Sequence, residues 1–285
     1  PPVELSLSNR RNGPRCGGGI PTNPPRMSLP DWQLPPGVAR PMWEYAHQVE
    51  VARQYDRSIA DSGLARFDEQ LLSARFHVPG RLADLGCGSG RLAVHFAQRG
   101  CEVWAVDLSH EMLRVAVEQA AAAEVRVLPV EANLCELDCL ATSSFDYVLC
   151  MFSTLGMIEG GANRLRALEH VRRLLAPGGR LALHVHNVWF NAWLPAGRAW
   201  LLRDRLGQWL LRRPGGDRRM HDRGIPNMFM HVFSMGEIRG LLRQANLVLD
   251  EVVPLDATCS GPLLYAHWLP GLRANGWVLF AHRPA

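Results

Sequence analysis

Apolar residues in the middle of the chain follow two patterns that alternate along the sequence. Short apolar runs, typical of buried strands, are separated by stretches whose apolar residues recur every three or four positions, which is typical of helices. Strands that alternate with helices predict an α/β fold in which the strands form a doubly wound, mostly parallel sheet with helices on both faces. The seven expected strands are 81–85, 101–107, 125–130, 145–152, 180–186, 247–255 and 276–282.

The first of these strands ends in an acid and runs into three closely spaced glycines, Asp84-Leu85-Gly86-Cys87-Gly88-Ser89-Gly90. Glycines at this spacing let the backbone turn tightly and approach a ligand without a Cβ in the way. The N–H groups at the start of the following helix can then hold polar or anionic atoms. Asp107, at the end of the second strand, follows at the distance of about 20 residues at which nucleotide-binding units place a ribose-binding acid. The sequence therefore predicts a nucleotide site at this edge of the sheet.

These residues also carry a family resemblance. Asp84–Gly90 resembles the first motif of the class I S-adenosylmethionine-dependent methyltransferases, and Asp107 matches their ribose-binding acid. The phrase Leu-Leu-Ala-Pro-Gly-Gly at 174–179 resembles the loop that precedes their fifth strand. An NAD-dependent dehydrogenase, the alternative, would more usually show Gly-x-Gly-x-x-Gly. The resemblance covers about residues 43–285, is strongest over 81–186, and implies a Rossmann-like fold with S-adenosylmethionine as cofactor.

The resemblance also implies which residues hold the cofactor. Asn133 stands where family members often have an aspartate that accepts from the adenine amino group; the alternative is a plain turn asparagine. Tyr55 would help close over the cofactor, unless its segment is only a helix docked on the core. Cys150 and Met151, at the end of the fourth strand, would border the cofactor through backbone atoms. The expected cofactor-binding residues are Tyr55, Asp84, Gly86, Cys87, Gly88, Gly90, Asp107, Leu108, Asn133, Leu134, Cys150 and Met151.

The two ends of the chain differ in composition. Residues 1–41 hold half of the 20 prolines and a run of three glycines, with little apolar periodicity, which predicts a disordered tail. Residues 42–285 form the expected methyltransferase domain. The chain has no apolar run long enough for a bilayer and no recognisable signal sequence, although it begins with Pro1 and its native start is open. Together with seven cysteines that lack paired spacing, this predicts a cytoplasmic protein with reduced thiols.

Several kinds of chemistry are disfavoured by the residues present. All 31 basic residues are arginines, so no lysine can act as a nucleophile or form a Schiff base. Cys135 and Cys139 have no second pair to complete a zinc site, and His184 and His186 alternate on one strand face without a carboxylate nearby in sequence. We assign these two histidines to packing or substrate contact and expect no metal. His231 is the candidate general base, with a structural role as the alternative.

Residues 188–227 break the regular pattern and form the expected insert that covers the substrate site. Eight arginines oppose three aspartates here and are interleaved with tryptophans and a phenylalanine. Such a mixture can grip phosphates and stack on bases. Alternatively, the aromatic residues pack inward from an amphipathic cover helix and the arginines are merely solvated.

We therefore expect an enzyme that transfers a methyl group from S-adenosylmethionine to an oxygen or nitrogen of a small-molecule substrate. One alternative is an enzyme like the tRNA wobble-uridine carboxymethyl methyltransferases, because residues 229–237 are similar to a segment of that family. Another is a partner subunit that binds the cofactor without catalysis. No membrane partner is expected.

Overall fold

The computed structural model describes residues 29–47, 63–212, 215–222 and 225–285. The chain divides into two units, Pro1–Gln33 and Leu34–Ala285. Within the described part of the first unit lies a short 3-10 helix, η1 (Asp31–Gln33). Everything that follows concerns the second unit.

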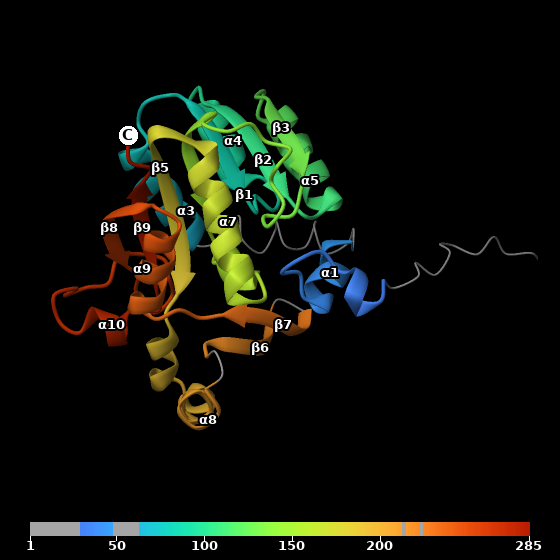
Figure 1. Ribbon diagram of the computed structural model, residues 1–285. Coiled ribbons are helices and arrows are strands. Elements are labelled where there is room, and N and C mark those ends of the chain that lie inside the picture. Colours follow the sequence, from blue (N-terminus) through green and yellow to red (C-terminus); the bar gives the residue numbers. More distant parts are fainter. Residues whose placement is uncertain (1–28, 48–62, 213–214, 223–224) are drawn as a thin grey trace, which may run out of the picture. The chain divides into compact units, whose positions relative to one another are not determined.

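A seven-stranded sheet is the centre of this unit, with strand order β3-β2-β1-β4-β5-β9-β8 (Figure 1). The first five strands in this order are parallel, and β9 is antiparallel to both of its neighbours. The chain thus winds outward from β1 in both directions, as the alternating pattern predicts. The strands are β1 (Arg81–Leu85), β2 (Glu102–Asp107), β3 (Val127–Glu131), β4 (Phe145–Cys150), β5 (Leu175–His186), β8 (Val248–Pro254) and β9 (Gly276–His282).

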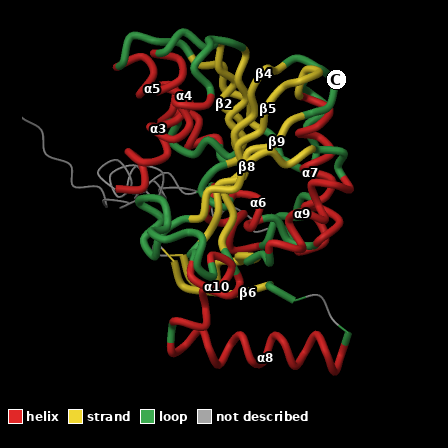
Figure 2. The backbone as a smooth tube through the Cα atoms, turned by 90° about the vertical axis from the view of Figure 1, so that its left-hand side faces the viewer, coloured by secondary structure: helices red, strands yellow, loops and turns green. Residues whose placement is uncertain are grey.

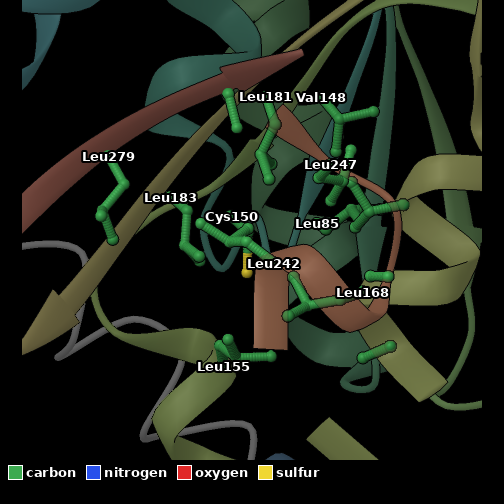
Figure 3. Packing of buried hydrophobic residues seen from close by; sticks show 14 of the residues in the cluster. Leu85, Val148, Cys150, Leu155, Leu168, Leu181, Leu183, Leu242, Leu247 and Leu279 are labelled. Atoms are coloured by element: carbon green, nitrogen blue, oxygen red, sulfur yellow. The ribbon is translucent and has the colours of Figure 1, made fainter. Parts of the chain in front are cut away.

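Helices cover both faces of the sheet (Figure 2). On one face, α7 and α9 pack their apolar residues against alternate sheet residues such as Leu181 and Leu183 (Figure 3). On the other, α3, α4 and α5 pack against the intervening residues, among them Leu149 and Ala182. The described helices of these layers are α3 (Gly63–Arg75), α4 (Arg91–Gln98), α5 (His110–Ala122), α7 (Gly161–Leu174) and α9 (Met235–Gln244).

Serine side chains cap the first turns of two helices. The Ser109 hydroxyl accepts the Met112 N–H at 3.2 Å and begins α5. The Ser234 hydroxyl accepts the Glu237 N–H at 3.1 Å and begins α9. The Glu237 carboxylate, which the capping-box pattern assigns to the Ser234 backbone, binds the His231 ring instead.

The predicted boundary after residue 41 is too late. Residues from Leu34 onward belong to the larger unit, and the Ala39 side chain is already buried. Helix α1 (Arg40–Ala46) begins at a proline-containing first turn, where the missing proline N–H costs nothing. One of the prolines counted toward the predicted tail, Pro41, therefore lies in the first turn of a helix. Residues 1–28 lie outside the described part.

The insert after β5 consists of helices and a separate two-stranded sheet. It begins with the 3-10 helix η2 (Val188–Trp193) and helix α8 (Pro195–Leu211), followed by β6 (Asp217–Asp222) and β7 (Ile225–His231), which pair as an antiparallel hairpin. Strand β7 packs against α1 and against the short helix α6 (Thr154–Met157). In both views α8 lies beyond β6 (Figures 1 and 2). A last short helix, α10 (Pro270–Arg273), packs near η2.

Two glycines with positive φ differ in the space around them, so substitutions at these positions distinguish the cost of backbone strain from the cost of a steric clash. Gly90 (φ +84°) caps α4, and a Cβ there would lie 2.5 Å from the Ala116 Cβ on α5. Gly178 (φ +76°) has nothing near the same position. We expect Gly178→Ala to lower the free energy of unfolding by about 1–2 kcal/mol. We expect Gly90→Ala to cost a further ~1–3 kcal/mol because it overpacks the α4–α5 contact. Urea unfolding of both variants measures the difference, and equal losses would contradict the steric argument.

Candidate functional site

The glycine loop between β1 and α4 is held by the end of β2. The backbone N–H groups of Gly86 and Cys87 both donate to the Val106 carbonyl, at 2.8 and 3.0 Å. Gly86 and Gly88 have φ of +74° and +55°, in the left-handed region that glycine adopts without a Cβ penalty. The loop therefore follows a path that other residues would strain, and its backbone faces the carboxyl edge of the sheet.

Asp107 joins this loop to the next helix. One carboxylate oxygen accepts the Gly88 N–H at 2.9 Å, and the other accepts the Ser109 N–H at 2.9 Å. Burial raises the pKa of Asp107, and the hydrogen bonds from Ser109, Gly88 and Leu108 act in the opposite direction. Each carboxylate oxygen has a second lone pair, so both can still accept from a ligand.

A cavity opens directly beside these residues. Its walls come from the glycine loop, the ends of β2 and β3, the segment after β4, helix α1 and strand β7. Most of its lining is apolar. The lining residues are Gly37, Val38, Met42, Tyr45, Ala46, Gly86, Gly88, Asp107, Leu108, Ser109, Met112, Ala132, Asn133, Leu134, Phe152, Thr154, Met157, Ile158 and Met228.

Comparison with known proteins identifies this arrangement. Residues 82–179 match a family model described as a methyltransferase domain. This range therefore has the sequence pattern of a methyltransferase domain. The matched range of the methyltransferase domain runs from β1 into β5 and includes the glycine loop and Asp107.

Relatives of this methyltransferase domain extend over part of the chain. A ubiquinone biosynthesis O-methyltransferase of Xanthomonas oryzae pv. oryzae is 36% identical over 121 residues, which is 41% of this chain and 47% of that protein. The chain thus spans about half the length of the curated relatives it matches.

Two solved structures share the fold over more of the chain. An S-adenosylmethionine-dependent methyltransferase from Methanosarcina mazei has a TM-score of 0.57 at 24% identity, covering 72% of this chain and 92% of its own. The 1,6-didemethyltoxoflavin-N1-methyltransferase of Burkholderia thailandensis has a TM-score of 0.57 at 20% identity, covering 88% and 94%.

Six residues expected from sequence line the cavity: Gly86, Gly88, Asp107, Leu108, Asn133 and Leu134. Asn133 also bonds to the backbone around it. Its side-chain oxygen accepts the Cys135 N–H at 3.1 Å, and its amide nitrogen donates to the Pro36 carbonyl at 2.9 Å. Asn133 therefore forms a turn hydrogen bond, and its oxygen keeps one lone pair toward the cavity.

Asp84, Cys87 and Gly90 lie behind the lining. Asp84 is buried in β1, and burial raises its pKa to about 7 despite the nearby charge of Arg91. Burial likewise raises the pKa of the Cys87 thiol, and the charges of Asp107 and Asp84 add to this effect. Gly90 packs against α5. These three residues shape the loop from its inner side.

The residues after β4 that line the cavity lie further along the sequence than predicted. The Cys150 and Met151 side chains are buried in the two apolar clusters on opposite faces of the sheet. Burial raises the pKa of the Cys150 thiol to about 12, which excludes a nucleophilic role at neutral pH. Phe152 and Thr154 line the cavity instead. Phe152 and Ser153 have φ of +57° and +60°, so the chain turns sharply here.

Part of the cavity wall comes from residues that are distant in sequence and were not predicted to lie there. Helix α1 contributes Met42, Tyr45 and Ala46, and the Ser109 hydroxyl, which caps α5, donates to the Ala46 carbonyl. The helical spacing around residues 42–52 predicts a docked helix, so the signal was present, but the partner surface was not evident. Tyr55, the residue predicted to close over the cofactor, lies outside the described residues.

His231 is not placed to act as a general base. Its ring is 1% exposed and does not line the cavity. Nδ1 lies 2.7 Å from Asp217 and Nε2 lies 2.8 Å from Glu237. Burial alone would lower the pKa of His231, but the two carboxylates outweigh it and raise the pKa. Both ring nitrogens are thus engaged by carboxylates, which favours the structural alternative.

Arg164 completes this charged network beneath the insert. It is buried on α7, 3.8 Å from Asp217, and its guanidinium donates to the Ile158 carbonyl at 2.9 Å. Burial lowers the pKa of Arg164, and the charges of Asp217 and Glu237 oppose this. The network thus joins β6, β7, α7 and α9 under the methyltransferase cavity wall.

The raised pKa of His231 makes its contribution to stability pH-dependent. The contribution is complete below the unfolded-state pKa of about 6.5 and is lost as pH rises through the higher folded-state pKa. We expect His231→Gln to lower the free energy of unfolding by about 2–3 kcal/mol near pH 6 and by less near pH 9. His282→Gln, which removes a solvent-exposed pair with Asp250, should change little at either pH. Denaturant titrations at both pH values test this, and a pH-independent loss at His231 would contradict it.

Proposed function

We propose that the chain is an S-adenosylmethionine-dependent methyltransferase that methylates an oxygen or nitrogen of a small molecule. The observation that carries the proposal is the Asp107 carboxylate held at the mouth of the glycine loop, with both oxygens able to accept further hydrogen bonds. A nucleoside ribose offers two adjacent hydroxyl donors, which this carboxylate matches.

The residues around the cavity fit the rest of this cofactor. Leu108, Met112 and Leu134 supply apolar walls for an adenine ring, and Asn133 supplies an acceptor for its amino group. Gly86 and Gly88 have no side chains, so the methionine part can lie against their backbone. A Cβ at Gly86 would also collide with the Thr154 side chain. Asp84, behind the loop, supplies a negative charge near the place where the methionine ammonium would lie. The opposite charge of an ammonium would favour ionisation of this carboxyl group.

The protein's own contribution to methyl transfer is alignment and exclusion of water. The sulfonium of the bound cofactor supplies an already activated methyl group. Phe152, Thr154, Met157 and Met228 also line the cavity, and we assign them to the wall that would hold the acceptor. An apolar wall keeps water from the reacting atoms and fixes the approach of the acceptor. With His231 engaged by two carboxylates, we assign no general base.

A small molecule is the favoured substrate for two reasons. By their names, one protein named above is an O-methyltransferase of ubiquinone biosynthesis, and another is an N1-methyltransferase of 1,6-didemethyltoxoflavin. In addition, three of the described arginines of the insert are engaged by the protein itself. Arg218 binds the Asn191 side chain and lies over Trp200, and Arg198 donates to the Ala192 carbonyl. Arg219 lies 3.6 Å from Glu159.

Removal of the ribose acid tests the cofactor assignment. Asp107→Ala deletes two charge-assisted hydrogen bonds, each worth about 1–2 kcal/mol. We therefore expect affinity for S-adenosylhomocysteine, measured by calorimetry, to fall by about 30-fold or more. Glu131→Gln is the matched control, since Glu131 pairs with Asp107 in the sheet register but is exposed. An Asp107→Ala affinity within threefold of the parent would refute the assignment, provided circular dichroism shows a folded chain.

Substitution of exposed arginines of the insert distinguishes a small-molecule substrate from transfer RNA. Labelled cofactor should be screened with phenolic and heterocyclic metabolites and with total transfer RNA. We expect transfer to a small acceptor, and we expect Arg203→Ser with Arg212→Ser, both exposed, to leave its rate unchanged. If transfer RNA is the substrate, its affinity falls steeply with salt, and the double variant lowers the logarithmic salt slope by about 1–2. That second outcome would replace the small-molecule proposal.

A further inference from the structure

Two histidines and a cysteine lie close together on one face of the sheet, and none of them lines the cavity described above. His184 and His186 alternate along β5 and therefore point to the same face, the one covered by α3 and α4. Cys259 lies in the loop between β8 and α10 and is buried in the apolar cluster of that face. One ligand atom from each residue lies within 4.8 Å of the other two.

The His184 ring is buried without a partner. Its side chain is 1% exposed, and neither ring nitrogen has a hydrogen-bond partner in the part of the chain that the structure describes. Buried polar side-chain atoms nearly always have a partner, so an orphaned pair on one imidazole calls for a ligand. The ring centroids of His184 and His186 lie 5.1 Å apart, with an angle of 69° between the ring planes.

The backbone around the cluster makes room at these nitrogens. Strand β9 pairs with β5 so that Gly276 lies opposite His186. A Cβ on Gly276 would lie 3.1 Å from the His184 Nε2 atom and still closer to the Val185 carbonyl. Glycine at this register position therefore keeps a side chain away from the histidine.

We propose that His184, His186 and Cys259 bind a zinc-class transition metal ion through two imidazole nitrogens and one thiolate. Nitrogen and sulfur donors suit zinc, whereas magnesium and calcium require oxygen ligands. The three protein ligands leave a fourth tetrahedral position for water or another small ligand. A tetrahedral zinc site places ligand atoms about 3.3–3.8 Å apart, so atoms that now lie within 4.8 Å of one another need to approach by at most about 1.5 Å. His186, which is only half-buried, can supply that movement.

Metal binding at this cluster is balanced by the release of a proton. The neutral imidazoles donate their lone pairs directly, whereas the Cys259 S–H bond must break, its proton passing to solvent as the metal–sulfur bond forms. The zinc affinity should therefore rise with pH. The proposal does not depend on methyl transfer, and its test uses metal binding alone.

Cobalt(II) provides the most direct test, because it reports both geometry and ligand type. The untagged full chain, freed of metal with a chelator, is titrated with cobalt(II) and then with zinc(II). We expect one cobalt per chain, with a thiolate-to-cobalt charge-transfer band and the strong visible bands of tetrahedral cobalt. Zinc should abolish both. If cobalt produces no thiolate band in the parent chain, the proposal is overturned, whatever the variants do.

Variants assign the signal to its ligands. Cys259→Ala should abolish the charge-transfer band and weaken zinc binding by about 100-fold or more, and His184→Gln should weaken zinc binding similarly. Cys101→Ala is the matched control, because Cys101 is buried in the same apolar cluster but is not part of the group, and it should bind like the parent. Circular dichroism monitors the folding of each variant. A folded Cys259→Ala chain that keeps the band, or a Cys101→Ala chain that loses it, would contradict the assignment.

Discussion

The end of β2 is the constraint on which the rest of the site depends. The Val106 carbonyl accepts the N–H groups of Gly86 and Cys87, and the Asp107 carboxylate accepts those of Gly88 and Ser109. These bonds hold the glycine loop on one side and the start of α5 on the other. Because β1 and β2 are parallel and adjacent, with Leu85 opposite Val106, both strand ends reach the same edge of the sheet. The position of the loop is therefore set by sheet register rather than by the loop sequence alone.

Much of the fold could be predicted because its determinants are local. Each parallel strand is a short apolar run, and each connecting helix carries its own period and, at α5 and α9, its own cap. The hairpin of β6 and β7 was not predicted. β6 reads Asp-Arg-Arg-Met-His-Asp, which has no alternation of apolar and polar residues. This hairpin forms because β6 pairs with β7 and because β7 packs against α1 and α6. Such tertiary contacts cannot be recognised in the sequence of one strand.

The candidate site divides in the same way. Gly86, Gly88 and Asp107 could be predicted because their spacing reflects one turn and one neighbouring strand. Met42 on α1 and Met228 on β7 could not, since each reaches the cavity from a distant part of the chain. Asn133 lies between these cases: its turn hydrogen bond to Cys135 is local, whereas its bond to Pro36 is not.

Two buried histidines show why residue type alone is a poor guide to function. His231 has a carboxylate on each ring nitrogen, so its charge is satisfied and it serves as a link between β7, β6 and α9. His184 is as deeply buried and has no such partner in the described residues. A buried polar group left unsatisfied costs about 1–3 kcal/mol, a large fraction of the net stability of a folded domain. A fold that carries such a cost beside a second histidine and a cysteine has a donor set in place, and occupation of that set by a metal ion would offset the cost.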